Sequence, residues 1–276
     1  MPVTGDKTTN RKYTTAISKG AAMVDEMRRL LEQWRPDESL DAFVERVQEE
    51  GLLGNATAYR TRDIVRRVFA PRFLRPTDKP ARVLKHILAS GLPGRTFTEM
   101  LFVYAARNDP LIYDFTVREY WPAVRRGRPV LGTDVMLAFL SEAVVDGRLD
   151  SQWSEKVSVR IARCVLGMLR DVGFLREVRR GRREIVDYHM SEEGTAILAR
   201  ELHEDGVTDS ALCSHPDWGL FGLSAAEVLE RLDGLGEHRG VLVQRAGSVV
   251  HFTLSLIHIS EPTRPLYISY AVFCLK

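Results

Sequence analysis

The residues best suited to chemistry in this sequence are basic side chains that recur at helical spacing. At about 100° per residue, four of them fall on one stripe of a helix: Lys156, Arg160, Arg163 and Arg170. A second group follows in the run RRGRR: Arg179, Arg180, Arg182 and Arg183. Guanidinium groups bind phosphate oxygens and can pair with guanine edges in the major groove of DNA. The two groups therefore predict contact with a nucleic acid.

The elements around these residues have the order of a winged helix-turn-helix. On the helix of the basic stripe, the predicted buried face consists of Val157, Ile161, Cys164, Val165 and Met168, with Leu166 outside it. An apolar helix ending at Gly147 precedes it, and the short runs GFLREV and EIVDYHM follow, flanking the arginines with Gly181 at the turn. Such a hairpin can lie along the DNA backbone or enter the minor groove. The alternative is a module of this kind that contacts proteins.

A second basic segment lies nearer the amino terminus. The stretch SLDAFVERVQEE, with Ser39 as the expected cap, and the stretch AYRTRDIVRRVF predict a helix pair. The arginines of the second helix are Arg60, Arg62, Arg66 and Arg67. They can contact nucleic acid, or they can form the solvated side of a bundle helix, and the sequence favours neither.

Charge is distributed unevenly along the chain, although the net charge is only +2. Residues 57–95 contain ten basic and two acidic side chains, whereas residues 191–237 contain eleven acidic and two basic ones. This asymmetry predicts one surface that binds polyanions and another that repels them. Mutual neutralisation of the two segments is the alternative.

Helical periodicity dominates the first 170 residues or so, beginning with SKGAAMVDEMRRLLEQW. Capping boxes are expected at Thr96/Glu99 and at Ser224/Glu227, and a second hairpin at GVLVQRAGSVVHFT with Gly247 at its turn. The expected fold is mainly α, with a helical amino-terminal domain followed by winged-helix-like units with small hairpins. The expected segments are a disordered tail (1–12), a basic helical domain (13–128), the winged-helix-like unit (129–190) and an acidic helical segment with a hairpin (191–253).

Signatures of enzymes, metals and membranes are missing from the sequence. There is no phosphate-binding loop, dinucleotide fingerprint or zinc-helix motif, and the three cysteines lack ligand spacing. His215 and Asp217 stand two apart, but no nucleophile accompanies them. No apolar run reaches the roughly 18 residues that a bilayer span needs. We therefore expect a soluble cytoplasmic protein that is not an enzyme and has no catalytic residues, no metal and no cofactor.

Three stretches resemble the BrxA family of bacteriophage-exclusion (BREX) defence systems: KYTTAISKGAAMVDEMRRLLEQW, MLFVYAARNDPLIYDFTVREYWP and HPDWGLFGLSAAEVLERL. The resemblance runs from about Tyr13 to Thr253. It implies an amino-terminal domain similar to the NusB RNA-binding fold, DNA binding, and a role beside the system's methyltransferase and ATPase. The leading hypothesis is a non-catalytic component that binds double-stranded DNA. The alternatives are an RNA-binding module and a scaffold that docks defence partners through its acidic carboxy-terminal part.

The closing stretch, LSLIHISEPTRPLYISYAVFCLK, differs in character from all that precedes it. Reverse-translated in one frame, its two ends fit the two ends of a transposase-type sequencing adapter, with Pro265–Tyr267 where a sample index would stand. We therefore expect residues 254–276 to be adapter read-through. No function is inferred from this segment.

Overall fold

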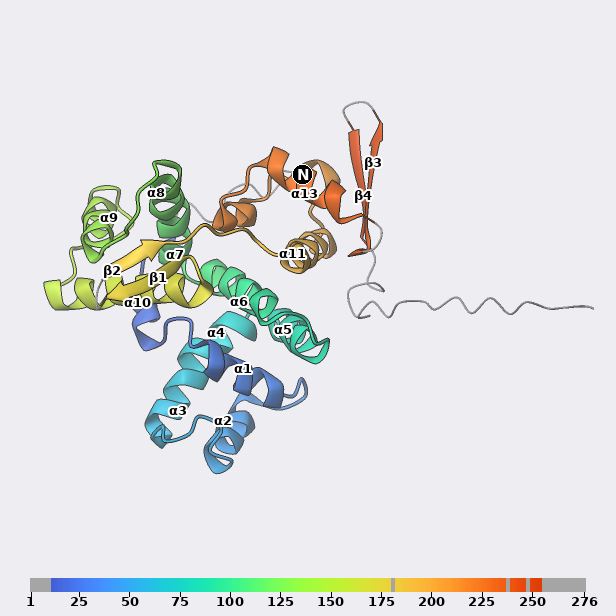
Figure 1. Cartoon of the computed structure of the whole chain (residues 1–276). Helices are drawn as coiled ribbons and strands as arrows, with labels where there is room; N and C mark the ends of the chain where they lie inside the picture. Colours follow the sequence, from blue (N-terminus) through green and yellow to red (C-terminus); the bar gives the residue numbers. More distant parts are fainter. Residues whose placement is uncertain (1–10, 180–181, 237–238, 247–248, 255–276) are drawn as a thin grey trace, which may run out of the picture.

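The fold is mainly helical, with two small antiparallel hairpins, as Figure 1 shows. This computed structural model describes residues 11–179, 182–236, 239–246 and 249–254. The α-helices are α1 (Val24–Gln33), α2 (Leu40–Glu49), α3 (Ala58–Ile64), α4 (Ala70–Phe73), α5 (Lys79–Ala89), α6 (Gly94–Asn108), α7 (Pro110–Phe115), α8 (Trp121–Arg125), α9 (Thr133–Val145), α10 (Glu155–Val172), α11 (Glu192–Glu204), α12 (Asp209–Leu212) and α13 (Ala225–Leu235). The expected fold class is confirmed.

Shorter helical turns and the strands complete the structure. The 3-10 turns are η1 (Ala16–Lys19) and η4 (Pro216–Phe221), and the π-helical turns are η2 (Val65–Phe69) and η3 (Thr116–Tyr120). The hairpins pair β1 (Leu175–Arg179) with β2 (Arg182–Ile185), and β3 (Val241–Ala246) with β4 (Val249–Leu254). The expected turn glycines, Gly181 and Gly247, lie outside the described residues. Leu254, where read-through was expected to begin, pairs with Val241 in β4, and residues 255–276 also lie outside the described part.

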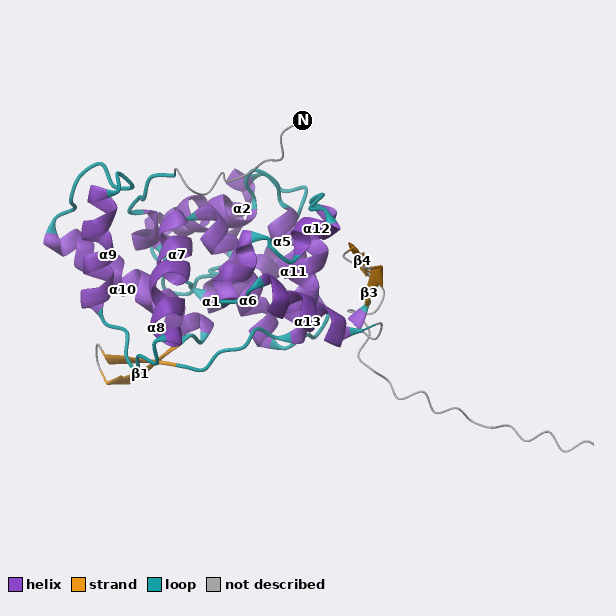
Figure 2. Cartoon of the chain, turned by 90° about the horizontal axis from the view of Figure 1, so that it is seen from above, coloured by secondary structure: helices purple, strands orange, loops and turns teal. Residues whose placement is uncertain are grey.

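The helices gather around α6, which runs through the centre of the molecule in Figure 1. Helices α1 to α5 lie on one side of it, α7 to α10 with the first hairpin on another, and α11 to α13 with the second hairpin on a third (Figures 1 and 2). Buried apolar side chains from Tyr13 to Phe252 form one connected cluster. The segment boundaries expected at residues 128 and 190 stay predictions.

Local capping signals locate several helices correctly. The Ser39 hydroxyl accepts a hydrogen bond from the Ala42 amide, and Ser224 and Glu227 form the expected capping box. The first long helix, in contrast, begins later than its periodicity predicts. Met23 has a left-handed backbone (φ 50°), which interrupts the helix, so α1 starts only at Val24.

The capping box expected at Thr96 and Glu99 is wrong, because both residues lie inside α6 and are fully buried. The Glu99 carboxylate instead reaches the start of α11. It accepts hydrogen bonds from the Tyr188 hydroxyl (2.8 Å) and the Ser191 amide (2.9 Å), and Arg95 Nε lies 3.1 Å away. The sequence pattern indicated a local cap, whereas the partners of Glu99 on the α11 side are about 90 residues away.

A short third segment pairs with the first hairpin, which the sequence did not indicate. Val130 bridges Glu184 of β2, Leu131 N donates to Arg183 O (3.1 Å), and Ile185 N donates to Pro129 O (3.0 Å). The segment between α8 and α9 therefore runs antiparallel to β2. Together with α10, which packs against β1, it holds the hairpin against the helical body.

The segment before η1 crosses the α9–α10 connection. Tyr13 N donates to Arg148 O (2.9 Å), the Tyr13 hydroxyl lies 2.5 Å from Asp114 Oδ2, and Lys12 Nζ lies 2.8 Å from Asp150 Oδ1. Lys12, which was expected in a disordered tail, is thus tied to the structure. Residues 1–10 lie outside the described part.

None of the helices in the described ranges is both long enough and apolar enough to span a bilayer.

Asp109 caps α7 although it is only 4% exposed. The charge on this buried carboxylate should therefore lower the stability of the fold at high pH. Burial raises the pKa of its carboxyl to about 6, against the lowering effects of the Leu111 amide and Arg72. The pKa of Asp109 is higher in the folded than in the unfolded chain. Its contribution to the free energy of unfolding is therefore favourable at low pH and is lost as pH rises through about 6. Asp109→Asn keeps the cap without the charge. Its free energy of unfolding should exceed the wild-type value by about 3 kcal/mol at about pH 8, with little difference at about pH 4. Urea unfolding at both pH values measures this, and an equal difference at both would contradict it.

Glu99→Ala should destabilise the protein strongly, because the Arg95 guanidinium, the Tyr188 hydroxyl and the Ser191 amide all lose their shared acceptor. We expect the free energy of unfolding to fall by about 3 kcal/mol. Glu45→Ala, on the exposed side of α2, is the control and should change it by less than about 0.5 kcal/mol. Equal effects of the two substitutions in urea unfolding would show that Glu99 does not join α6 to α11.

Candidate nucleic-acid interface

The basic stripe predicted on α10 is exposed along its whole length. Lys156, Arg160, Arg163 and Arg170 all lie on the solvent side of the helix. Ile161, Val165 and Met168 are buried as expected, whereas Val157 and Cys164 are only half-buried. Leu166 is fully buried, contrary to the wheel. The reason is that α10 packs against both α9 and α6, so its buried arc is wider than one face.

Two of the four cations on α10 have no partner within the described residues, and these are Lys156 and Arg163. Arg160 Nη2 donates to Ser18 O at 3.0 Å, and Arg170 is paired with Asp171 (2.6 Å) and Glu177 (3.2 Å). The free charge therefore lies in the amino-terminal half of the helix. At the carboxy-terminal end, Arg170 links the helix to β1.

A hollow of about 510 Å³ lies along this part of α10, between Lys156, Arg160 and Arg163. Val159 and Cys164 also line it. Burial raises the pKa of the Cys164 thiol above its ordinary value, so the thiol stays neutral near pH 7. The hollow is therefore lined by three basic residues, two apolar ones and one acidic residue, Glu155.

The predicted hairpin arginines divide into exposed and buried residues. Arg179 and Arg182 are exposed and make no ion pair within the described ranges, and Arg180 lies outside those ranges. Arg183 does not belong to the exposed tip, as the sequence had suggested. It is only 8% exposed, and its Nε has no hydrogen-bond partner in the described part. The β2 residues alternate between the two faces of the hairpin, and Arg183 is on the inner one.

The arginines of α3 and η2 have mostly local partners. Arg60 and Arg67 lie 3.7 Å and 3.0 Å from Asp63, and Arg66 is paired with Asp41. Arg62 is exposed and has no partner among the described residues. Asp63, only 7% exposed, thus neutralises part of this group.

The turn η1 brings the two basic groups together, although more than 80 residues separate them in the sequence. It packs against η2 on one side and against α10 on the other. Lys19 Nζ of η1 lies 3.6 Å from the same Asp63, and Ser18 O accepts the hydrogen bond from Arg160. Lys19 is therefore a basic residue between the two groups that the sequence did not single out.

The acidic segment is largely engaged in contacts within its own part of the molecule. Asp209 lies close to His251, the Glu227 carboxylate caps α13, and Arg239 lies 2.9 Å from Glu193. Lys79, one of the ten cations of residues 57–95, pairs directly with this segment, 2.6 Å from Asp205. The basic segment 57–95 and the acidic segment 191–237 therefore neutralise each other at Lys79. The other acidic side chains named above have partners in their own part of the molecule.

No group of three His, Cys, Asp or Glu side chains within the described residues could hold a metal ion. The residues that the structure gathers on α10, η1 and the hairpin are cationic, and what they can do chemically is bind anions.

Comparison with known proteins places the fold. The statistical model of the BrxA family matches residues 11–201, which is more than half of the chain. A solved structure, "Crystal structure of an uncharacterized protein from Magnetospirillum magneticum", aligns with a TM-score of 0.56 and 19% sequence identity. The alignment covers 70% of this chain and 95% of that one, and at this identity it shows the fold alone. No curated protein matches the chain. The chain therefore belongs to the BrxA family, which is associated with BREX anti-phage defence.

Proposed function

We propose that this protein binds double-stranded DNA, without catalysing a reaction, as a component of a BREX defence system. The observation that carries the proposal is the exposed basic stripe of α10, with Lys156 and Arg163 free of partners within the described residues. A helix fits the major groove of DNA, where its cations reach phosphates and guanine edges.

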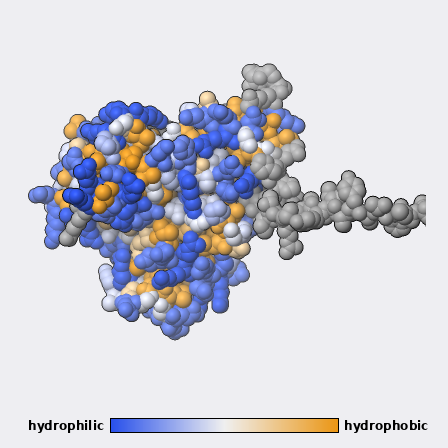
Figure 3. Space-filling model, in the orientation of Figure 1, coloured by the Kyte–Doolittle hydropathy of each residue, from blue (hydrophilic) through white to orange (hydrophobic). Residues whose placement is uncertain are grey.

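The elements next to α10 support this proposal. The order α8, the 129–131 segment, α9, α10, β1 and β2 is that of a winged helix, with the hairpin as the wing. Arg179 and Arg182 are exposed on that hairpin, where they can contact the adjacent backbone. On the face shown in Figure 3, hydrophilic residues cover much of the surface, with hydrophobic areas between them.

Removing the free charge of α10 should weaken DNA binding and lower its salt dependence. The test variant combines Lys156→Ala, Arg160→Ala and Arg163→Ala. Fluorescence anisotropy with labelled duplex DNA, at several salt concentrations, should give a log–log slope smaller by about 0.9 for each phosphate that the variant no longer neutralises. A duplex RNA arm discriminates the RNA-binding alternative, and tighter binding to RNA would overturn the proposal.

A matched control keeps the same change in net charge on other elements. It combines Arg29→Ala, Arg35→Ala and Arg82→Ala, which are exposed residues of α1, the following loop and α5. This variant should keep the wild-type slope. Equally weakened binding by both variants would mean that only net charge matters. An absence of binding to DNA and RNA at low salt would leave a scaffold role.

Two neighbouring arginines of β2 should respond in opposite ways. Arg182→Ala should lower the affinity for duplex DNA and leave the free energy of unfolding unchanged, because the side chain is exposed. Arg183→Ala should lower the free energy of unfolding by about 1–2 kcal/mol, because its buried aliphatic stem packs under the hairpin. Urea unfolding and anisotropy on both variants measure this. An Arg182 variant with wild-type affinity would remove the hairpin from the interface.

A further inference from the structure

A basic cavity of about 320 Å³ lies between the α4–α5 connection and the carboxy-terminal ends of α6 and α11. None of these elements belongs to the proposed DNA-binding surface. The charged residues that line the cavity are five basic ones and one acidic one: Arg11, Arg72, Arg75, Lys79, Arg107 and Asp205.

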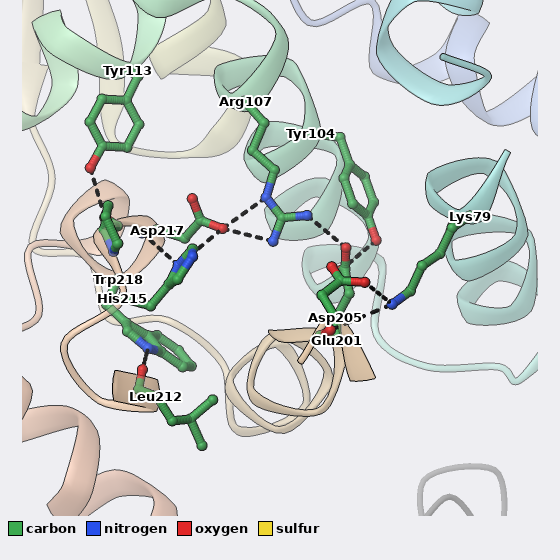
Figure 4. A network of polar contacts seen from close by, with 11 residues as sticks. Lys79, Tyr104, Arg107, Tyr113, Glu201, Asp205, Leu212, His215, Asp217 and Trp218 are labelled. Carbon is green, nitrogen blue, oxygen red and sulfur yellow. Dashed lines mark hydrogen bonds and ion pairs between the residues drawn. The ribbon is translucent and has the colours of Figure 1, made fainter. Parts of the chain in front are cut away.

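One wall of the cavity is held in place by ion pairs, which Figure 4 shows. Lys79 Nζ lies 2.6 Å from Asp205 Oδ1. Arg107 lies 2.6 Å from Glu201 Oε1 and 2.7 Å from Asp217 Oδ2. Their carboxylate partners, which also include Glu204 at 3.4 Å from Lys79 Nζ, offset the charges of these two cations. These two cations therefore leave no excess of positive charge on this side of the cavity.

Three other lining arginines have no carboxylate within 4.0 Å in the described part of the chain: Arg11, Arg72 and Arg75. Arg72 donates from both Nη atoms to backbone carbonyl oxygens at 2.7 Å. Arg11 does the same at 3.0 and 3.1 Å, and Arg75 is exposed without a partner among the described residues. Because carbonyl oxygens carry only partial charge, these three lining arginines leave a surplus of positive charge beside the cavity.

Arg72 is only 5% exposed, so its positive charge is costly to bury. The pKa of its guanidinium is lowered to about 10, chiefly by desolvation, and the charge of Asp109 opposes that shift. Arg72 is still charged near pH 7. An anion in the cavity would therefore stabilise a buried cation that has no close carboxylate among the described residues.

The start of α5 adds a further favourable feature. Thr77, Lys79 and Pro80 line the cavity, and the side chain of the N-cap residue, Asp78, makes no capping hydrogen bond. It is instead paired with Arg82. The first-turn amides of α5 thus lack a side-chain cap, and the amino-terminal end of a helix favours negative charge.

We propose that this cavity binds a phosphate monoester, with the phosphate group against Arg72, Arg75 and Arg11. A planar guanidinium group such as that of Arg75 matches the oxygens of a phosphate through paired hydrogen bonds, and a dianion suits a group of cations that have no carboxylate partner among the described residues. The cavity has room for more than a phosphate ion. Pro71, Pro76 and Pro80 line it as well and offer apolar surface to the carbon part of a small ligand.

The test measures binding of inorganic phosphate and of a ribose 5-phosphate probe to the whole protein by calorimetry. Sodium chloride at equal ionic strength is the reference. Saturable binding of both probes is expected, and Arg75→Ala should weaken it by about tenfold, which corresponds to about one charge-assisted hydrogen bond. Arg75 is exposed, so the substitution should leave folding intact, as an unchanged unfolding midpoint would verify.

Arg29→Ala is the matched control, because Arg29 is an exposed arginine of α1 that does not line the cavity. It should bind the probes as the wild type does. The inference is overturned if neither probe binds saturably, or if Arg75→Ala binds as tightly as Arg29→Ala. These outcomes are independent of the DNA-binding proposal, since the α10 triple variant should keep its affinity for the probes.

A phosphate monoester can also come from the end of a nucleic acid strand. The arms that separate the two sources are short oligonucleotides with a 5′-phosphate and with a 5′-hydroxyl. A drop in affinity on removing the 5′-phosphate that disappears in Arg75→Ala would assign the cavity to strand ends. Equal affinities for the two oligonucleotides, with saturable binding of ribose 5-phosphate, would assign it to a free small molecule.

Discussion

The packing of aromatic rings around Phe174 is the interaction on which the arrangement of the basic surface depends. Phe174 follows Gly173, the C-cap of α10, and is fully buried, with ring centroids 4.5 Å from Tyr188, 5.1 Å from Tyr120 and 5.3 Å from Phe102. These rings come from α6, from η3 and from the segment after β2. The Tyr120 hydroxyl also donates to the Phe174 carbonyl at 3.0 Å. Since aromatic pairs contribute about 0.5–1.5 kcal/mol each beyond area burial, this cluster fixes where α10 ends and where the hairpin begins.

Electrostatics divides the basic residues of this protein into two classes. Some form ion pairs within the fold. Arg107 joins α6 to α11 and η4 in this way, and Arg60 and Arg67 pair with Asp63. Others point to solvent without a partner in the described part, and on α10 these are Lys156 and Arg163. An ion pair between partners already held in place costs little to keep formed, whereas a free cation can exchange its counterions for phosphates. Formal charge along the sequence does not separate the two classes.

Signals within one helical turn were sufficient to place much of the fold. Ser39 and Ser224 cap the helices that they were expected to cap, because the donor and the acceptor are three residues apart. The basic stripe of α10 is exposed, because it follows from helical geometry alone. The same local signal misled at Glu99, whose partners Tyr188 and Ser191 are distant in sequence. It also misled at Leu166, which a second packing partner buries.

The sequence by itself determined the mainly helical fold, the order of helix, helix and hairpin, and the four cations that line one side of α10. These follow from periodicity and from contacts between near neighbours. Only the tertiary structure decided that Arg183 is buried, that the 129–131 segment pairs with β2, and that η1 joins α10 to η2. It alone also assembled the cavity of Arg11, Arg72 and Arg75. The physical reason is that burial and pairing between distant segments depend on how the helices pack, which no local pattern encodes.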